Sequence, residues 1–102
     1  MATTHLNERL LGAPASLGLE TRADFRRDAV AALEEMPEGA GRLLIDLTLT
    51  SHVDSAGLGA LMLVQRRAAE RRQAVVLIHP SDELRFLLVL TKLIDLFEIQ
   101  AA

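Results

Sequence analysis

LLIDLTLTSHVDSAGLGALML, residues 43–63, joins two apolar runs through a polar loop. Its first three residues are typical of a strand buried on both faces, and the apolar run after Ser55 has helical length. The loop between them, residues 48–59, gathers hydroxyl, imidazole and carboxylate side chains ahead of two glycines, and we call it the elbow. The stretch therefore predicts a strand, an elbow and a helix around which the rest of the chain is arranged.

Asp54 and Ser55 stand where this helix should begin. One of them can cap the free N–H groups of the first turn while the other faces solvent. A helix N-terminus carries roughly +0.5 of an elementary charge, which favours an added anion such as a phosphoryl group. Ser55 is therefore a candidate phosphorylation site, although the same two residues also fit an ordinary, unmodified pair of capping residues.

The composition restricts the class of protein. The 102 residues suffice for one domain with a core, and 50% of them are hydrophobic. Cysteine is absent, which excludes disulfides and thiolate metal sites. A net charge of −3 has the wrong sign for a protein that binds nucleic acid by neutralising phosphates. We therefore expect no direct nucleic-acid partner.

The sequence also lacks the patterns of membrane insertion and secretion. No apolar run reaches the roughly 18 residues that a membrane span requires. The first residues, MATTHLNERLL, show no basic segment followed by an apolar one, as a secretory signal would. We expect a cytoplasmic protein that does not insert into a membrane.

The chain before the elbow predicts two strands and a helix. Residues 6–11 fit a short strand, and residues 16–18 fit a turn. Thr21-Arg22-Ala23-Asp24 has the form of a capping box, and the apolar face that follows predicts a helix over residues 22–35, ended by Pro37. Residues 42–47 form the strand that enters the elbow.

The chain after the elbow alternates between helix and strand. We expect a helix over residues 55–72, a strand over 74–78, a helix beginning at Ser81 and a last short strand over 96–99. A strand, helix and strand at this spacing predict two parallel strands joined by a right-handed crossover. The fold class is therefore α/β, with βαβ crossovers.

The motif DSAGLGAL, residues 54–61, after an apolar strand that ends in Asp46-Leu47-Thr48, resembles the signature of STAS domains. The passage VVLIHPSDELRFLL and the closing LTKLIDLFEI extend the resemblance over roughly residues 41–99, and it is strongest to bacterial anti-sigma factor antagonists. It implies a single STAS domain over residues 1–102. It also implies a small mixed β-sheet with helices packed against it. LLGAPASLGLE, residues 10–20, is short where the family usually has two well-marked strands, so we expect residues 1–19 to be reduced or poorly ordered. Lys92 departs from the family, in which many members have glycine there.

The resemblance also implies a function. Ser55 matches the serine that an anti-sigma factor with protein-kinase activity phosphorylates, and a serine phosphatase reverses this. The unphosphorylated antagonist binds the kinase and thereby releases a sigma factor. We expect the partner to contact the elbow, through the following residues: Thr48, Thr50, Ser51, His52, Asp54, Ser55, Ala56, Gly57 and Leu58.

Two alternatives keep the fold and change the role. The same elbow could dock a partner without phosphorylation, as in the STAS scaffold subunit of a bacterial lipid-transport ATPase complex. It could also belong to a subunit of a larger sensory assembly.

Catalytic, metal and cofactor sites are weakly indicated. Ser55, His52 and Asp46 include the residue types of a nucleophilic triad, but no G-x-S-x-G elbow is present and all three crowd into one segment. The three histidines His5, His52 and His79 lack the spacing of metal ligands. We expect no enzyme activity, no metal and no cofactor.

Three further features have simpler interpretations. Gly57 and Gly59 fit neither phosphate-binding fingerprint, so we expect them to allow close packing of the helix on the sheet. The arginine group, Arg66, Arg67, Arg71 and Arg72, fits a solvated helix face. The apolar helix after Ser81 belongs mainly to the core, although one edge, including Phe86, could contact another protein or a second copy in a weak homodimer.

Overall fold

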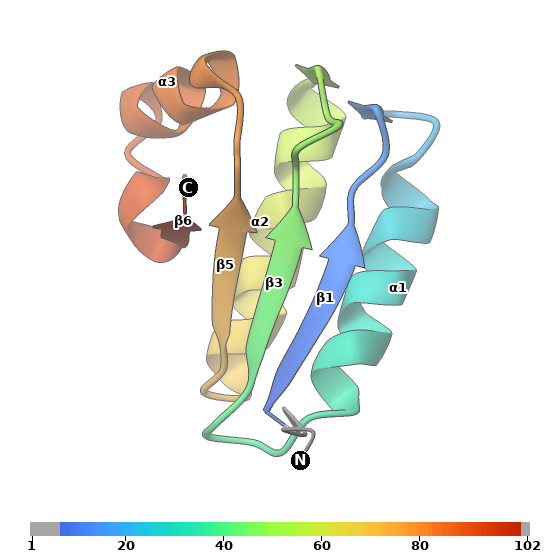
Figure 1. The fold of residues 1–102 in the computed structure, drawn as a ribbon, viewed down its shortest axis with the longest axis vertical. Helices are drawn as coiled ribbons and strands as arrows, with labels where there is room; N and C mark the ends of the chain where they lie inside the picture. The colour runs from blue at the N-terminus through green and yellow to red at the C-terminus, as the bar shows by residue number, and fades with distance from the viewer. Residues whose placement is uncertain (1–6, 101–102) are drawn as a thin grey trace.

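The computed structural model describes residues 7–100 and shows an α/β fold (Figure 1). The elements are β1 Glu8–Gly12, β2 Ser16–Leu17, α1 Arg22–Glu34, β3 Arg42–Asp46, β4 His52–Val53, α2 Ser55–Glu70, β5 Ala74–Ile78, α3 Asp82–Leu90, the 3₁₀ helix η1 Ile94–Leu96 and β6 Glu98–Gln100. The larger sheet has the order β1-β3-β5-β6, and β2 pairs with β4. The predicted α/β class is thereby confirmed.

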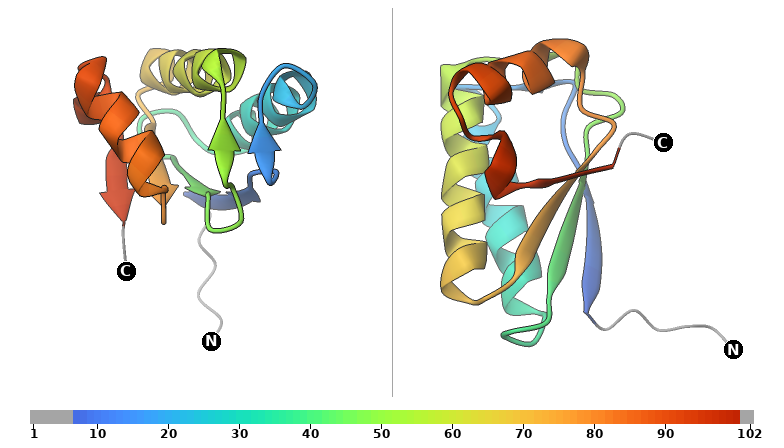
Figure 2. Two further views of the ribbon diagram at one scale, coloured as in Figure 1. Left: turned by 90° about the horizontal axis from the view of Figure 1, so that it is seen from above. Right: turned by 90° about the vertical axis from the view of Figure 1, so that its left-hand side faces the viewer.

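The helices and the sheet form two layers (Figure 2). Helices α1 and α2 lie side by side against one face of the larger sheet, and α3 lies near the carboxyl ends of its strands. In Figure 1 the chain passes from β3 behind the sheet through α2 and returns at β5 on the left, which is the predicted right-handed crossover. Within residues 7–100 no helix covers the opposite face.

The sheet differs from the implied mixed sheet because all described pairs are parallel. Each connection between neighbouring strands of the larger sheet contains a helix, which returns the chain to the end where the previous strand began. Strands β3 and β5 pair along their whole length, from Arg42 opposite Ala74 to Asp46 opposite Ile78. The elbow follows β3 and therefore lies at the carboxyl end of these central strands.

The core lies between the sheet and α1 and α2. Alternate β3 residues Leu43 and Ile45 point into it, and Leu33 of α1 and Leu61 of α2 meet them, each with 0% exposure. Burying one such side chain contributes roughly 1.5–3 kcal/mol. The packing fixes where β3 ends and α2 begins, and hence the geometry of the elbow.

The helix bounds agree with the sequence to within two residues, but the start of α1 differs from the prediction. The Thr21 hydroxyl makes no capping hydrogen bond to the helix. It accepts from the Gly18 N–H at 3.0 Å and donates to the Ser16 carbonyl at 2.8 Å. The capping-box prediction is therefore wrong, because the hydroxyl is occupied by the turn that precedes the helix.

Two helices end at residues with a positive φ that are not glycine. Arg72 after α2 has φ +55°, and Lys92 after α3 has φ +60°. In each case the N–H of the next residue bonds back into the helix, from Gln73 to Ala68 and from Leu93 to Leu88. Lys92 thus adopts the left-handed conformation that glycine favours, at the position where the resemblance expects glycine.

One member of the arginine group is not part of a solvated face. Arg71 donates to the Met36 carbonyl at 2.9 Å and to the Gln73 side-chain oxygen at 3.1 Å. Gln73 is 8% exposed and donates to the Leu33 carbonyl at 3.0 Å. These contacts bind carbonyls at the end of α1 and join it to the end of α2. Arg66, Arg67 and Arg72 are exposed as expected.

Both ends of the described chain differ from the predictions. The first strand begins at Glu8, and Leu6 of the predicted strand lies outside the described residues. Residues 16–18 are not simply a turn, because Ser16 and Leu17 pair with His52 and Val53 of β4. The last strand is β6 rather than residues 96–99, since η1 occupies Ile94–Leu96 before the chain extends.

In the described part of the chain, no helix is both long and apolar enough to cross a bilayer.

Candidate functional site

The sequence predicted that one of Asp54 and Ser55 caps α2 and that the other faces solvent, and the structure shows which residue does which. Asp54 is the N-cap of α2, and its Oδ1 accepts from the Gly57 N–H at 2.9 Å. Ser55 is the first helical residue and is exposed. Within residues 7–100 its hydroxyl makes no hydrogen bond. The α2 N-terminus therefore presents a free hydroxyl to solvent.

Hydrogen bonds attach the elbow to the segment between β1 and α1. The Ser51 N–H donates to Ala15 at 2.9 Å, and the Thr50 hydroxyl donates to the Pro14 carbonyl at 2.8 Å. The Asp54 N–H donates to the Leu17 carbonyl at 3.2 Å. In return, Asp54 Oδ2 accepts from the Leu19 N–H at 3.3 Å. The elbow is thus held by a segment that lies more than 30 residues earlier in the sequence.

Gly57 allows the closest of these approaches. A Cβ at this position would lie 2.0 Å from the Leu17 carbonyl oxygen, so β2 packs directly on the first turn of α2. Close packing was predicted, but the partner is β2 rather than the larger sheet. The same prediction is wrong for Gly59, where a Cβ would meet no atom within 4 Å.

The predicted contact residues differ in their exposure. Thr50 is 5% exposed and Gly57 is buried, so neither residue contributes to an outer surface. The remaining members are exposed or half-buried, as follows: Thr48, Ser51, His52, Asp54, Ser55, Ala56 and Leu58.

Sequence reasoning missed two apolar side chains near these residues. Leu49, within the elbow, is 79% exposed, and Leu19, whose N–H binds Asp54, is 66% exposed. Both are leucines in loops, outside any helical or strand periodicity, and that position was the available signal.

Hydrogen bonds stabilise two ionised carboxylates at the elbow. The Gly57 N–H, with a smaller contribution from the Leu19 N–H, lowers the pKa of Asp54. The Thr48 hydroxyl and then its N–H lower the pKa of Asp46. Asp54, which directly precedes Ser55, is therefore negatively charged at neutral pH.

Stability is expected to fall in acid as these two carboxylates become protonated. Their folded-state pKa values lie below the ordinary 3.8, so their contribution is complete above that pH and is lost as the pH falls through the lowered values. Urea unfolding across this range should show a smaller loss for an Asp46→Asn and Asp54→Asn double variant, whose amides do not titrate. Equal losses in both proteins would contradict this account.

Comparison with known protein families identifies the fold. A family model described as "Mlab, STAS domain" matches residues 6–98. The protein belongs to the STAS family. The match includes the elbow, both of its flanking elements and α3, and it confirms the resemblance seen in the sequence.

Solved structures share the fold of this STAS domain. A candidate anti-sigma factor antagonist from Thermotoga maritima has a TM-score of 0.80 at 19% identity, over 94% of this chain and 80% of that one. A sulfate transporter family protein from Wolinella succinogenes has a TM-score of 0.79 at 16% identity, over 98% of this chain and 81% of that one. The anti-sigma factor antagonist SpoIIAA in its unphosphorylated form has a TM-score of 0.73 at 16% identity, over 99% of this chain and 86% of that one. The sequence itself matches no curated protein.

The STAS domain does not assemble the residue types of a triad into a hydrogen-bonded unit. In the described part of the chain no hydrogen bond joins Ser55 to His52, and Asp46 accepts from Thr48 instead. His, Asp and Glu side chains of residues 7–100 also form no group of three that could hold a metal ion. His5 lies outside these residues.

Proposed function

We propose that this chain acts as a single STAS module and is an anti-sigma factor antagonist of the cytoplasm, without catalytic activity. It binds an anti-sigma factor of the protein-kinase type and thereby releases a sigma factor, until that kinase phosphorylates Ser55. A serine phosphatase restores the binding form. The observation that carries this proposal is the exposed, unbonded Ser55 hydroxyl at the N-terminus of α2, within the DSAGLGAL motif.

The electrostatics of the elbow support a modification that the partner detects and the fold tolerates. A phosphoryl group adds about −1.5 to −2 charges at neutral pH. The helix N-terminus favours such a charge by a few tenths to about 2 kcal/mol. Ionised Asp54 opposes it. Because the two effects largely offset each other, the main change is new charge and bulk on the outer surface, where a partner meets it.

Ser55 is expected to be the residue that a cognate kinase modifies. The purified protein is incubated with ATP and a purified anti-sigma factor of the protein-kinase type, and the intact mass is measured. Wild type should gain one phosphoryl group and Ser55→Ala none. Ser51→Ala is a matched control, because Ser51 is also exposed in the elbow but does not begin a helix, and it should be phosphorylated normally. Phosphorylation that persists in Ser55→Ala would overturn the assignment.

A second candidate function is a constitutive scaffold that docks a partner without phosphorylation. It draws support from the matching family model, which is described as "Mlab, STAS domain", and from the fold shared with a sulfate transporter family protein. Such a protein, in a lipid-transport ATPase complex or a sensory assembly, would bind its partner regardless of the charge at Ser55.

A further inference from the structure

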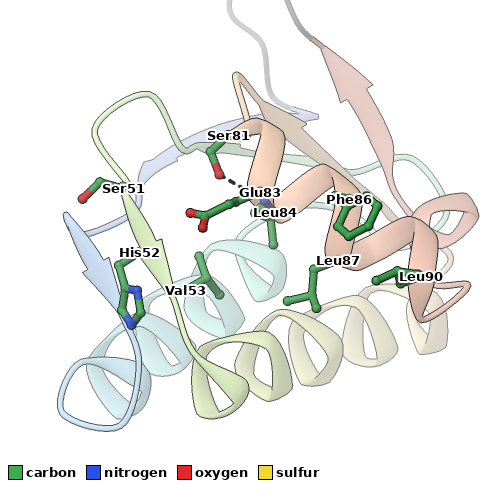
Figure 3. Close-up of a pocket in the computed structure, with 9 residues that line it drawn as sticks. All are labelled: Ser51, His52, Val53, Ser81, Glu83, Leu84, Phe86, Leu87 and Leu90. Atoms are coloured by element: carbon green, nitrogen blue, oxygen red, sulfur yellow. Dashed lines mark hydrogen bonds between the residues drawn. The ribbon is translucent and has the colours of Figure 1, made fainter.

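A groove lies between the elbow and α3, beside the proposed phosphorylation site (Figure 3). It has a volume of about 300 Å³. His52 and Val53 form one wall, and Val53 is followed directly by Asp54 and Ser55. Leu87 approaches the space from α3 on the opposite side. Ser55 therefore lies two residues along the chain from one wall of the groove.

The wall from α3 is a stripe at helical spacing. Glu83, Phe86, Leu87 and Leu90 fall at positions i, i+3, i+4 and i+7, so they lie along one side of the helix. Leu84 and Leu88 turn into the core and are buried.

The stripe leaves more apolar surface in water than folding requires. Phe86 is 65% exposed and Leu90 is 62% exposed. Two large apolar side chains beside a groove are typical of a protein contact surface. This agrees with the edge around Phe86 that the sequence singled out.

The one side chain of permanent charge that lines the groove is acidic, and Arg85 is exposed on the same helix outside the groove. Glu83 lines its end near the α3 N-terminus, and Asp82 is exposed beside it. Within residues 7–100 neither carboxylate forms an ion pair. Asp54 lies beyond His52 with a lowered pKa, and no lysine or arginine lines the groove. A complementary segment is apolar where it faces Phe86 and Leu90 and basic where it faces Glu83.

We propose that this groove seats an amphipathic helix of the kinase partner, with apolar side chains against Phe86 and Leu90 and a lysine or arginine against Glu83. An apolar groove with a charged end fits the helix-in-groove mode of recognition. The inference rests on the proposed function, since the partner is the protein that also reads Ser55. It adds a second contact, on α3, that does not depend on the state of the hydroxyl.

Calorimetric titration with the purified anti-sigma-type kinase tests the apolar part. Phe86→Ser and Leu90→Ser are each expected to raise the Kd at least about tenfold, as hot-spot residues do. Val89→Ser is the matched control, because Val89 is 57% exposed on the same helix but does not line the groove, and it should change the Kd less than about twofold. Circular dichroism shows that each variant is folded.

A charge reversal tests the acidic end. Glu83→Lys is expected to raise the Kd about fivefold or more, since it places like charges together. Glu34→Lys makes the same change in net charge on an exposed part of α1, away from the groove, and should have little effect. If the two substitutions raised the Kd equally, long-range attraction between the net charges of the two proteins would explain both effects. That result would overturn the assignment of a basic residue opposite Glu83.

The outcomes separate this inference from the proposed function. Binding that Ser55→Asp abolishes but that Phe86→Ser and Leu90→Ser leave unchanged would overturn the groove alone. No binding by wild type would overturn both. A homodimer of wild type that Phe86→Ser dissociates, measured by sedimentation without the kinase, would make the groove a contact between copies and would also overturn the proposal.

Discussion

Ser55→Asp is expected to weaken binding of the kinase partner by more than about tenfold, which corresponds to about 1.4 kcal/mol. The carboxylate places a permanent negative charge where the unmodified protein presents an exposed hydroxyl. In the proposed complex this position would face the phosphates of ATP, because a kinase that phosphorylates Ser55 must bring the γ-phosphate to its oxygen. Like charges then oppose each other in a desolvated contact.

The same substitution should leave the fold nearly as stable as wild type. A carboxylate in the first turn of a helix is favourable, and repulsion from Asp54 reduces that gain. Ser55→Asn is the matched control, since it has nearly the same shape without the charge, and it should retain most of the binding. Calorimetric titration of both variants decides the matter. If Ser55→Asp binds as tightly as wild type, the phosphorylation switch is ruled out and the constitutive scaffold is favoured.

Gly57→Ala is expected to destabilise the domain by about 3 kcal/mol or more, the upper end of the range for overpacking. The added Cβ would lie 2.0 Å from the Leu17 carbonyl oxygen. Because the obstacle is backbone, no side-chain rotation relieves the overlap, and β2 must separate from α2. That carbonyl also accepts from the Asp54 N–H, so the elbow should loosen with it. Thermal unfolding should show a Tm lower by more than about 10 °C.

Gly59→Ala is the matched control for this prediction. Gly59 occupies the same helix two residues later, is exposed, and would place its Cβ in open space. Alanine should stabilise the helix there by about 0.5–1 kcal/mol, because glycine loses more backbone freedom on folding. Opposite signs for the two substitutions would support the packing of β2 on α2. A loss of stability in both would show instead that α2 tolerates no substitution in this region.

Much of the fold was predictable from local patterns. The apolar run of β3, the face of α1 that includes Phe25 and Ala29, and the strand Ala74–Ile78 all appear where periodicity placed them. One wrong prediction concerns a polar group with two possible uses. The Thr21 hydroxyl could bond to its own helix or to the preceding turn, and tertiary contacts decide for the turn.

The site shows the same division. The motif around Ser55 was visible in the sequence, which left open whether Asp54 or Ser55 caps the helix, and the structure assigns the cap to Asp54. The exposed leucines and the groove were not visible in the sequence, because the exposure of an apolar residue depends on which elements cover it. Phe86 and Leu88 are both apolar residues of α3, yet one is 65% exposed and the other 0%.

The sequence by itself determined the alternation of strands and helices, the position of the elbow and the hydroxyl at its centre, since these depend on neighbours within a few residues. Only the tertiary structure decided which chain segment supports the elbow, that Gly57 and not Gly59 is the close contact, and which side of α3 remains in water. The physical reason is that packing and exposure arise between segments far apart in the chain. Local propensity is blind to such contacts, and the Leu17 carbonyl that meets Gly57 from β2 is one of them.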